Sequence, residues 1–93
     1  MGIEYSLGFA APSSEAIADV VRRLPAVREL HAPDHRFVLG LDESVSDWPE
    51  ATVIMETGGL YFCDHWGGAG RPALGVVVAA LTSRFGPVIV KEL

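Results

Sequence analysis

The stretch IEYSLGFAAPSSEAIADVVRRLPAVREL, residues 3–30, decides the fold because its hydrophobic period changes from two residues to 3.6. Apolar side chains alternate with polar or small ones over residues 3–9, as in a strand with one buried face. Pro-Ser-Ser-Glu then supplies a helix start, and the apolar spacing that follows predicts a helix over about residues 13–24. Pro25 ends this helix, and residues 27–32 predict a second strand.

The last part of the sequence has a similar outline. A helix with Pro72 in its first turn is predicted to run to about Phe85, because a proline is tolerated in the first helical turn. It is almost uncharged, so we expect other parts of the protein to cover it on both sides. Gly86 and Pro87 end it, and residues 88–93 predict a final strand whose apolar start favours a paired, interior position.

Two hairpins are predicted between these regions. The strand at 27–32 leads through an Ala-Pro-Asp turn into a strand at 36–41. Strand-like runs at 51–56 and 60–65 are joined through Thr-Gly-Gly, where glycine supplies the positive φ of a tight turn. Residues 42–50, DESVSDWPE, have no apolar period and predict a surface loop.

The segments RRLPAVREL (22–30) and SRFGPVIVKEL (83–93) are alike, since each runs from a helix end through a proline into a strand closing on a basic residue and Glu-Leu. Two right-handed β-α-β units in one sheet place both helices on the same face. We therefore predict an α+β fold: a ferredoxin-like sandwich of two β-α-β halves with an inserted hairpin around Phe37 and Val53. Its sheet should be mainly antiparallel, with two helices on one face. Residues 1–93 should form a single domain.

The composition excludes several classes of partner. Seven Lys and Arg against 12 Asp and Glu give a formal charge of −5, which disfavours nucleic acids and anionic membranes. Cys63 is the single cysteine, so no disulfide can form within the chain. The start of the chain does not resemble a signal peptide, and no apolar run is long enough to span a bilayer. We expect a cytoplasmic protein with neither cofactor nor metal.

The sheet face away from the helices carries the first group of candidate ligand-binding residues. The strand alternation puts Tyr61, Cys63 and His65 there, with Cys63 as a thiol nucleophile and His65 as its base. A dimer interface or a partly solvated sheet is the favoured alternative, because the sequence identifies no third group to orient the histidine. Trp66 and Arg71 border a glycine-rich loop, Gly67–Gly70, that leads into the second helix. This loop predicts either an anion site or a simple flexible connection.

Two further groups lie in turns. His31 and His35 flank Pro33 and Asp34 and could share a cation, although solvent-exposed turn histidines are the favoured interpretation. The acidic loop combines an aromatic anchor with carboxylates and predicts a partner-binding surface, or else a tryptophan folded back onto the domain. Its candidate residues are Asp42, Glu43, Asp47, Trp48 and Glu50.

These features favour a small non-enzymatic protein-interaction or regulatory domain. We expect it to form a homodimer and to bind a protein partner, and basic proteins are one candidate class. In size and acidity the chain is analogous to adaptors and to immunity proteins that neutralise basic toxins. The alternative is a dimeric α+β barrel-type enzyme or ligand-binding domain, with a pocket near Tyr61, His65 and Trp66.

Overall fold

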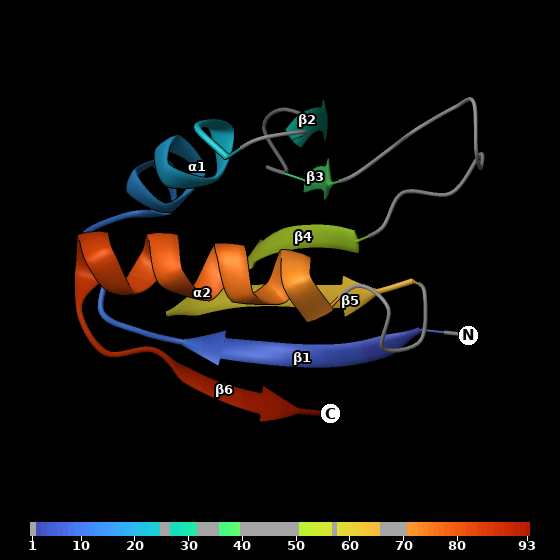
Figure 1. Cartoon of the computed structure of the whole chain (residues 1–93). Coiled ribbons are helices and arrows are strands. Elements are labelled where there is room, and N and C mark those ends of the chain that lie inside the picture. Colours follow the sequence, from blue (N-terminus) through green and yellow to red (C-terminus); the bar gives the residue numbers. More distant parts are fainter. Residues whose placement is uncertain (1, 25–26, 32–35, 40–50, 57, 66–70) are drawn as a thin grey trace.

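The computed structural model describes residues 2–24, 27–31, 36–39, 51–56, 58–65 and 71–93 (Figure 1). Within these residues the elements follow one another as β1 (Ile3–Gly8), α1 (Ser14–Arg22), β2 (Val27–His31), β3 (Arg36–Leu39), β4 (Ala51–Glu56), β5 (Gly59–Asp64), α2 (Arg71–Phe85) and β6 (Ile89–Glu92).

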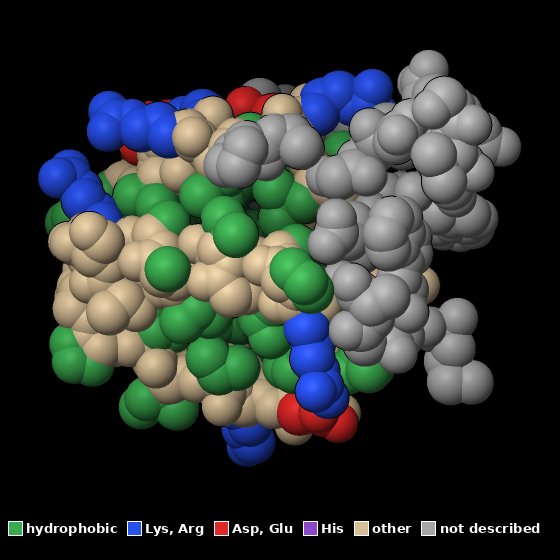
Figure 2. Space-filling view, viewed as in Figure 1, with side chains coloured by type: hydrophobic (Ala, Val, Ile, Leu, Met, Phe, Trp, Pro, Cys, Tyr) green, Lys and Arg blue, Asp and Glu red, His purple; other side chains and the backbone are tan. Residues whose placement is uncertain are grey.

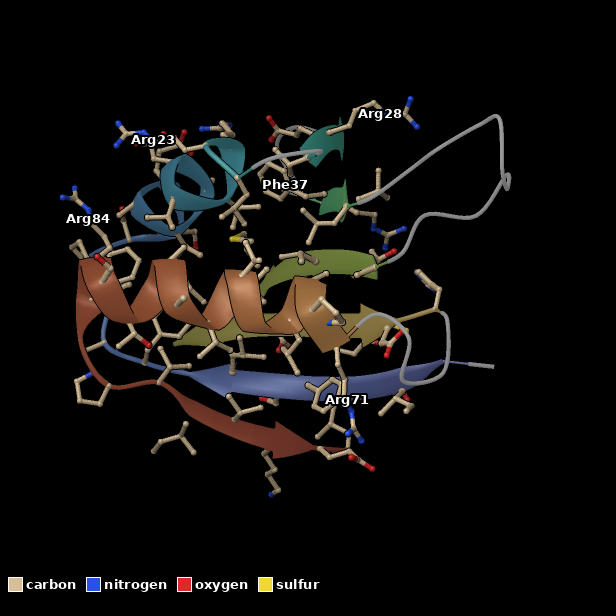
Figure 3. The ribbon with its side chains drawn as sticks, in the orientation of Figure 1. Arg23, Arg28, Phe37, Arg71 and Arg84 are labelled. Carbon is tan, nitrogen blue, oxygen red and sulfur yellow. The ribbon has the colours of Figure 1, made fainter. Side chains whose placement is uncertain are left out.

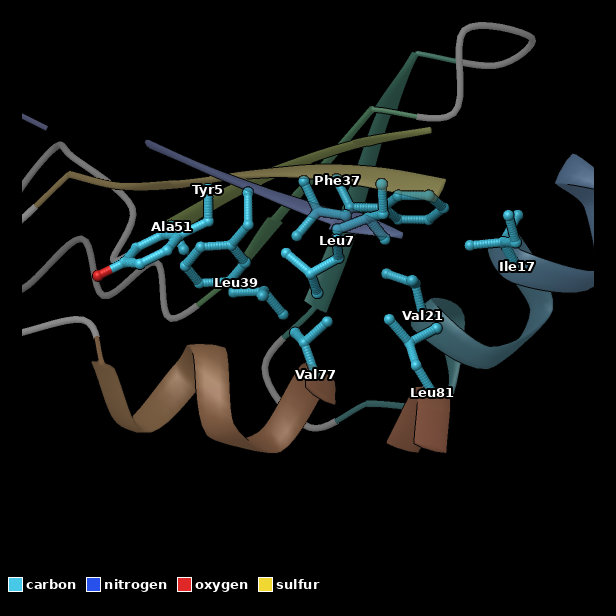
Figure 4. Packing of buried hydrophobic residues seen from close by; sticks show 13 residues of the cluster. Tyr5, Leu7, Ile17, Val21, Phe37, Leu39, Ala51, Val77 and Leu81 are labelled. Carbon is cyan, nitrogen blue, oxygen red and sulfur yellow. The ribbon is translucent and has the colours of Figure 1, made fainter. Parts of the chain in front are cut away.

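The described strands form one sheet in the order β2-β3-β4-β5-β1-β6, and every neighbouring pair is antiparallel. Both helices lie on the same face of this sheet (Figures 1 and 4). The predicted α+β class, the antiparallel sheet and the two helices on one face are therefore confirmed. The two helical connections differ in span: β5 and β6 have only β1 between them, whereas β1 and β2 are separated by three strands.

The hydrophobic core fills the space between the sheet and the helices (Figure 4). Because side chains alternate along a strand, β1 contributes Tyr5 and Leu7 while β5 contributes Leu60 and Phe62. Tyr5 and Phe62 make an edge-to-face contact with their ring centroids 6.2 Å apart. The other buried members of the core are Ile17, Ala18, Val21, Phe37, Leu39, Ala51, Val53, Val77 and Leu81.

Local sequence signals account for α1. The Ser13 hydroxyl accepts a hydrogen bond from the backbone N–H of Ala16 at 3.1 Å, which satisfies one of the free donors of the first turn. One stripe of the helix, formed by Ile17, Ala18 and Val21, is buried against the sheet and α2. The helix ends at Arg22, slightly before the predicted limit.

The structure corrects two expectations for the last part of the chain. The final strand, β6, is an edge strand and all its residues are exposed, so the predicted interior position is wrong. An apolar start favours burial on both faces, but in this segment only Val88, just before the strand, packs against the core. On α2, Gly75, Val76 and Ala79 are exposed, so this chain covers the helix on one side. The exposed side of α2 is uncharged because its residues are small or apolar, and not because it is buried.

The second predicted hairpin is confirmed. β4 and β5 pair antiparallel, and Gly58 has a φ of 74°, which favours glycine in the turn. β2 and β3 also pair as predicted, but residues 32–35 of their turn and the 42–50 loop lie outside the described residues. No helix in the described ranges is both long and apolar enough to cross a membrane.

Candidate functional site

The face of the sheet away from the helices carries rows of side chains drawn from different strands. In one row Tyr61 lies between Ile54 and Ser6, and Ser6 lies beside Lys91. In the next row Cys63 lies between Thr52 and Glu4. The predicted placement of Tyr61 and Cys63 on this face is thus supported by the register of every neighbouring strand.

Tyr61 is held by Glu4. Its phenol O–H donates to Glu4 Oε1 at 2.5 Å, across the β1–β5 ladder. Partial burial, the hydrogen bond to Glu4 and a second interaction with Cys63 raise the pKa of Tyr61 well above its usual value. The phenol therefore remains protonated throughout the physiological range.

A second set of contacts joins Cys63, His65 and Thr52. Cys63 Sγ lies 3.8 Å from His65 Nδ1, and His65 Nε2 lies 2.5 Å from Thr52 Oγ1. A neutral imidazole protonated on Nε2 would donate a hydrogen bond to Thr52 and accept one on Nδ1 from the Cys63 thiol. Thr52 is thus the orienting group that sequence reasoning missed. The signal was available, because the β4–β5 hairpin register places Thr52 opposite Cys63.

The surroundings of Cys63 limit what this arrangement can do chemically. The residue is 9% exposed, and a Cβ added at Gly2 would come within 2.8 Å of Sγ, so little space adjoins the sulfur. Its side-chain neighbours include Glu4 and Tyr61, which supply no positive charge to favour a thiolate. The geometry suits a satisfied polar network better than an activated nucleophile, and the enzyme alternative stays a prediction.

Replacing Tyr61 by phenylalanine tests the raised pKa. The folded chain keeps the phenol proton at pH values where the unfolded chain loses it. Below about pH 10 both states keep this proton, so titration of Tyr61 does not change the free energy of unfolding there. Above that pH the free energy of unfolding falls as the pH rises. We expect the melting temperature of the wild type to fall more steeply than that of Tyr61→Phe between about pH 10 and 11. Parallel melting curves for the two proteins would contradict the raised pKa.

The predicted ligand-binding residues do not all come together. Arg71 begins α2, on the helix-covered side of the sheet, and is exposed (Figure 3). Tyr61, Cys63 and His65 belong to the opposite face. Trp66 and Gly67–Gly70 lie outside the described residues. Arg71 is therefore separated by the sheet from the residues with which it was grouped.

The predicted partner-binding and metal residues fall mostly in other ranges. Asp42, Glu43, Asp47, Trp48 and Glu50 all lie outside the described residues, as do Pro33, Asp34 and His35. His31 ends β2. Among the side chains that the structure describes, no group of three or more His, Cys, Asp or Glu residues is placed to hold a metal ion.

Asp64 was not singled out from the sequence, yet it is the buried charged residue of the described core. It is 1% exposed and ends β5, opposite Ile3 on one side and Ala51 on the other. Its buried side-chain oxygens have hydrogen-bond partners. Strand alternation predicts its inward direction, because Leu60 and Phe62 precede it on the same side.

One outer edge of the sheet, β2, is protected. Arg22 of α1 donates from Nε and Nη2 to the two carboxylate oxygens of Glu29, at 3.1 and 3.3 Å. Arg22 also pairs with Glu15 and Asp19 at 3.1 Å each. The β2–β3 register shifts between Glu29 and His31, as it does at a bulge. Charge and irregular register are two features that discourage another strand from adding to an edge.

The other edge, β6, carries the charged residues Lys91 and Glu92 but has no irregular register. Its register with β1 is regular from Ile89 to Glu92. Ile89 is 74% exposed and Val90 is 42% exposed, and the next residue, Leu93, is also exposed. Figure 2, viewed from the side of the sheet that the helices cover, shows hydrophobic side chains over α2 and along β6. The strand therefore presents apolar side chains together with an unbroken backbone ladder.

Hydrogen bonding shows which β6 backbone groups point outward. The Leu93 N–H donates to the Glu4 carbonyl at 2.8 Å, so these opposed residues form a hydrogen-bonded pair. Hydrogen-bonded and non-hydrogen-bonded pairs alternate along an antiparallel ladder. Lys91 and Ile89 therefore also bond to β1. The N–H and C=O groups of Val90 and Glu92 point away from β1, along the outer edge.

Comparisons of this chain with protein-family models, with curated proteins and with solved structures gave no match.

Proposed function

We propose that this chain is a small non-enzymatic protein-interaction domain that binds an extended protein segment along β6. The observation that carries this proposal is the regular outer edge of β6, where the backbone groups of Val90 and Glu92 point outward. An added strand gains main-chain hydrogen bonds from such an edge, and pockets or apolar contacts for alternate side chains supply specificity.

Two properties of β6 support strand addition. Its exposed apolar residues are Ile89 on one face of the sheet and Val90 on the other. A partner strand could therefore make apolar cross-strand contacts on both faces. The opposite edge, by contrast, has the bulge and the Arg22–Glu29 pair that hinder such pairing. Binding is thereby directed to one side of the sheet. This role agrees with an adaptor or immunity-type protein of the cytoplasm.

We propose the ferredoxin-like sandwich as the finer description of the fold. When the β2–β3 hairpin is set aside, the remaining elements follow the order β-α-β-β-α-β along the chain. The hairpin then extends the β4 edge, so the insertion comprises β2 and β3 rather than the strands around Phe37 and Val53.

Val90→Pro tests the binding edge. Proline removes the outward N–H, and it is tolerated on an edge strand where that group faces solvent, so the domain should keep its fold. We expect proteins captured by the immobilised wild type from its native lysate to be reduced at least about tenfold with Val90→Pro, as loss of about 1.4 kcal/mol would give.

Val90→Thr is the matched control, because it keeps the N–H and the β-branched shape, and it should capture the same proteins as the wild type. Circular dichroism of all three proteins checks folding. Equal capture by folded Val90→Pro and the wild type would refute β6 as the binding edge.

A further inference from the structure

We infer that the strand that adds to β6 is β6 of a second copy, paired antiparallel about a two-fold axis that passes beside Val90. This inference rests on the proposed function and names its partner. Symmetric pairs of identical chains are the commonest oligomers, and a two-fold interface brings the same surface together from both copies. Every pairing in the described sheet is already antiparallel.

The outward backbone groups restrict how two copies of β6 can pair. Val90 and Glu92 alternate with the β6 residues that bond to β1, and the same alternation extended to the residue before the strand adds Val88. We take these three as the residues whose backbone groups can hydrogen-bond to a second copy. A two-fold axis perpendicular to the sheet also requires opposed residues to lie on the same face of it. The axis must therefore pass beside a residue whose backbone groups point away from β1, or beside one whose backbone groups bond to β1. Each position gives a different set of opposed side chains.

An axis beside Lys91 is unfavourable, because it places the lysines of the two copies directly opposite each other, where like charges repel. An axis beside Ile89 opposes the two isoleucines but pairs only Val88 with Val90, which leaves Glu92 without a backbone partner across the interface. An axis beside Val90 opposes Val90 to itself and Val88 to Glu92. It is the one arrangement of the three in which all three outward residues are hydrogen-bonded.

The same register gives the most exposed apolar side chain a suitable neighbour. Ile89, 74% exposed, lies opposite Lys91 of the second copy on the face away from the helices. A lysine can lay its methylene stem over an apolar side chain while its ammonium group stays in water. Val90, 42% exposed, meets its own counterpart on the helix side. Both exposed positions of the edge are covered, and no like charges are directly opposed.

Cysteine cross-linking tests the partner and the register together. In a Cys63→Ser background, which removes the chain's single thiol, cysteine is placed in turn at positions 89, 90 and 91. Opposed residues in a hydrogen-bonded antiparallel pair have Cα atoms about 5.5 Å apart, within reach of a disulfide. We expect Val90→Cys to form a covalent dimer under mild oxidation at least about tenfold faster than Ile89→Cys or Lys91→Cys.

Charge variants give a second measure by analytical ultracentrifugation. Ile89→Lys should dissociate the dimer, because the new lysine lies opposite Lys91 of the other copy. Adding Lys91→Glu should restore the dimer, since each opposed pair is then oppositely charged. With an axis beside Ile89 the double variant would still oppose two lysines. Its failure to restore the dimer would therefore overturn the register.

The outcomes separate this inference from the proposed function. A wild-type monomer at all concentrations, with capture of other proteins still lost in Val90→Pro, overturns self-pairing and leaves β6 as a binding edge. A monomer whose capture is unaffected by Val90→Pro overturns both. A dimer that Val90→Pro and Ile89→Lys leave intact uses another surface, which overturns the inference. A dimer cross-linked at position 90 and dissociated by Ile89→Lys supports it.

Discussion

Phe62→Ala is expected to lower the free energy of unfolding by about 3–5 kcal/mol. Phe62 is fully buried in β5, a strand that has β4 on one side and β1 on the other, and its ring makes an edge-to-face contact with the ring of Tyr5. Truncation removes apolar contacts and leaves a cavity that the flanking strands cannot collapse to fill. A domain of this size has about 5–15 kcal/mol of stability in total, so the loss approaches complete unfolding. Urea denaturation followed by circular dichroism measures the change.

Phe85→Ala is the matched control, because it deletes the same side chain from a partly exposed site. Phe85 ends α2 and stacks on Phe9 at a centroid distance of 5.6 Å. Its truncation leaves a space open to water, so the cost should be well below that for Phe62. Equal losses for the two variants would show that Phe62 does not occupy the centre of the core.

Gly59→Ala should cost about 3 kcal/mol or more, for the opposite reason. A Cβ at Gly59 would lie 2.1 Å from the carbonyl oxygen of Leu7, and that oxygen belongs to the backbone of the neighbouring strand. No side-chain rotation relieves this clash. The β1–β5 ladder would have to open, which would pull Leu7 and Leu60 out of the core. Thermal unfolding monitored by circular dichroism should show a large drop in melting temperature.

Gly8→Ala provides a stringent control, since Gly8 lies directly opposite Gly59 in the same ladder. A Cβ at Gly8 would meet nothing within 4 Å. Alanine also restricts the unfolded chain more than glycine does, so this variant should be neutral or stabilised by up to about 1 kcal/mol. If Gly59→Ala were as stable as Gly8→Ala, the close approach of β1 and β5 would be wrong.

Much of the fold could be predicted because local patterns and the tertiary structure agree. Alternation in β1 gave the inward direction of Tyr5 and Leu7, and Ser13 and Pro25 bracketed the first helix. The glycines at 58 and 59 gave the β4–β5 hairpin. In each case a few neighbouring residues carry the whole signal. The assignment of Tyr61 and Cys63 to one face followed from the same alternation.

The rest depended on contacts between distant parts of the chain. An apolar strand such as β6 has the same composition at the centre of a sheet and at its edge. Only the path of α2 over β1 decides between them. Thr52 lies beside His65 because β4 and β5 pair across the hairpin, and that signal appears only when the two strands and their turn are considered together. Arg71 was grouped with Tyr61 by closeness in sequence, although the sheet separates their faces.

The position of β1 between β5 and β6 has a consequence for the order of folding. β1 pairs with no strand from the first half of the chain, so it must wait for partners that are far away in sequence. The β4–β5 hairpin and α1 can form from local contacts alone, whereas docking β1 requires a long loop to close. We expect the hairpin to act as an early template onto which β1, and only then β6, is added. β1, whose alternation is clear in the sequence, is thus expected to dock later than the β4–β5 hairpin forms.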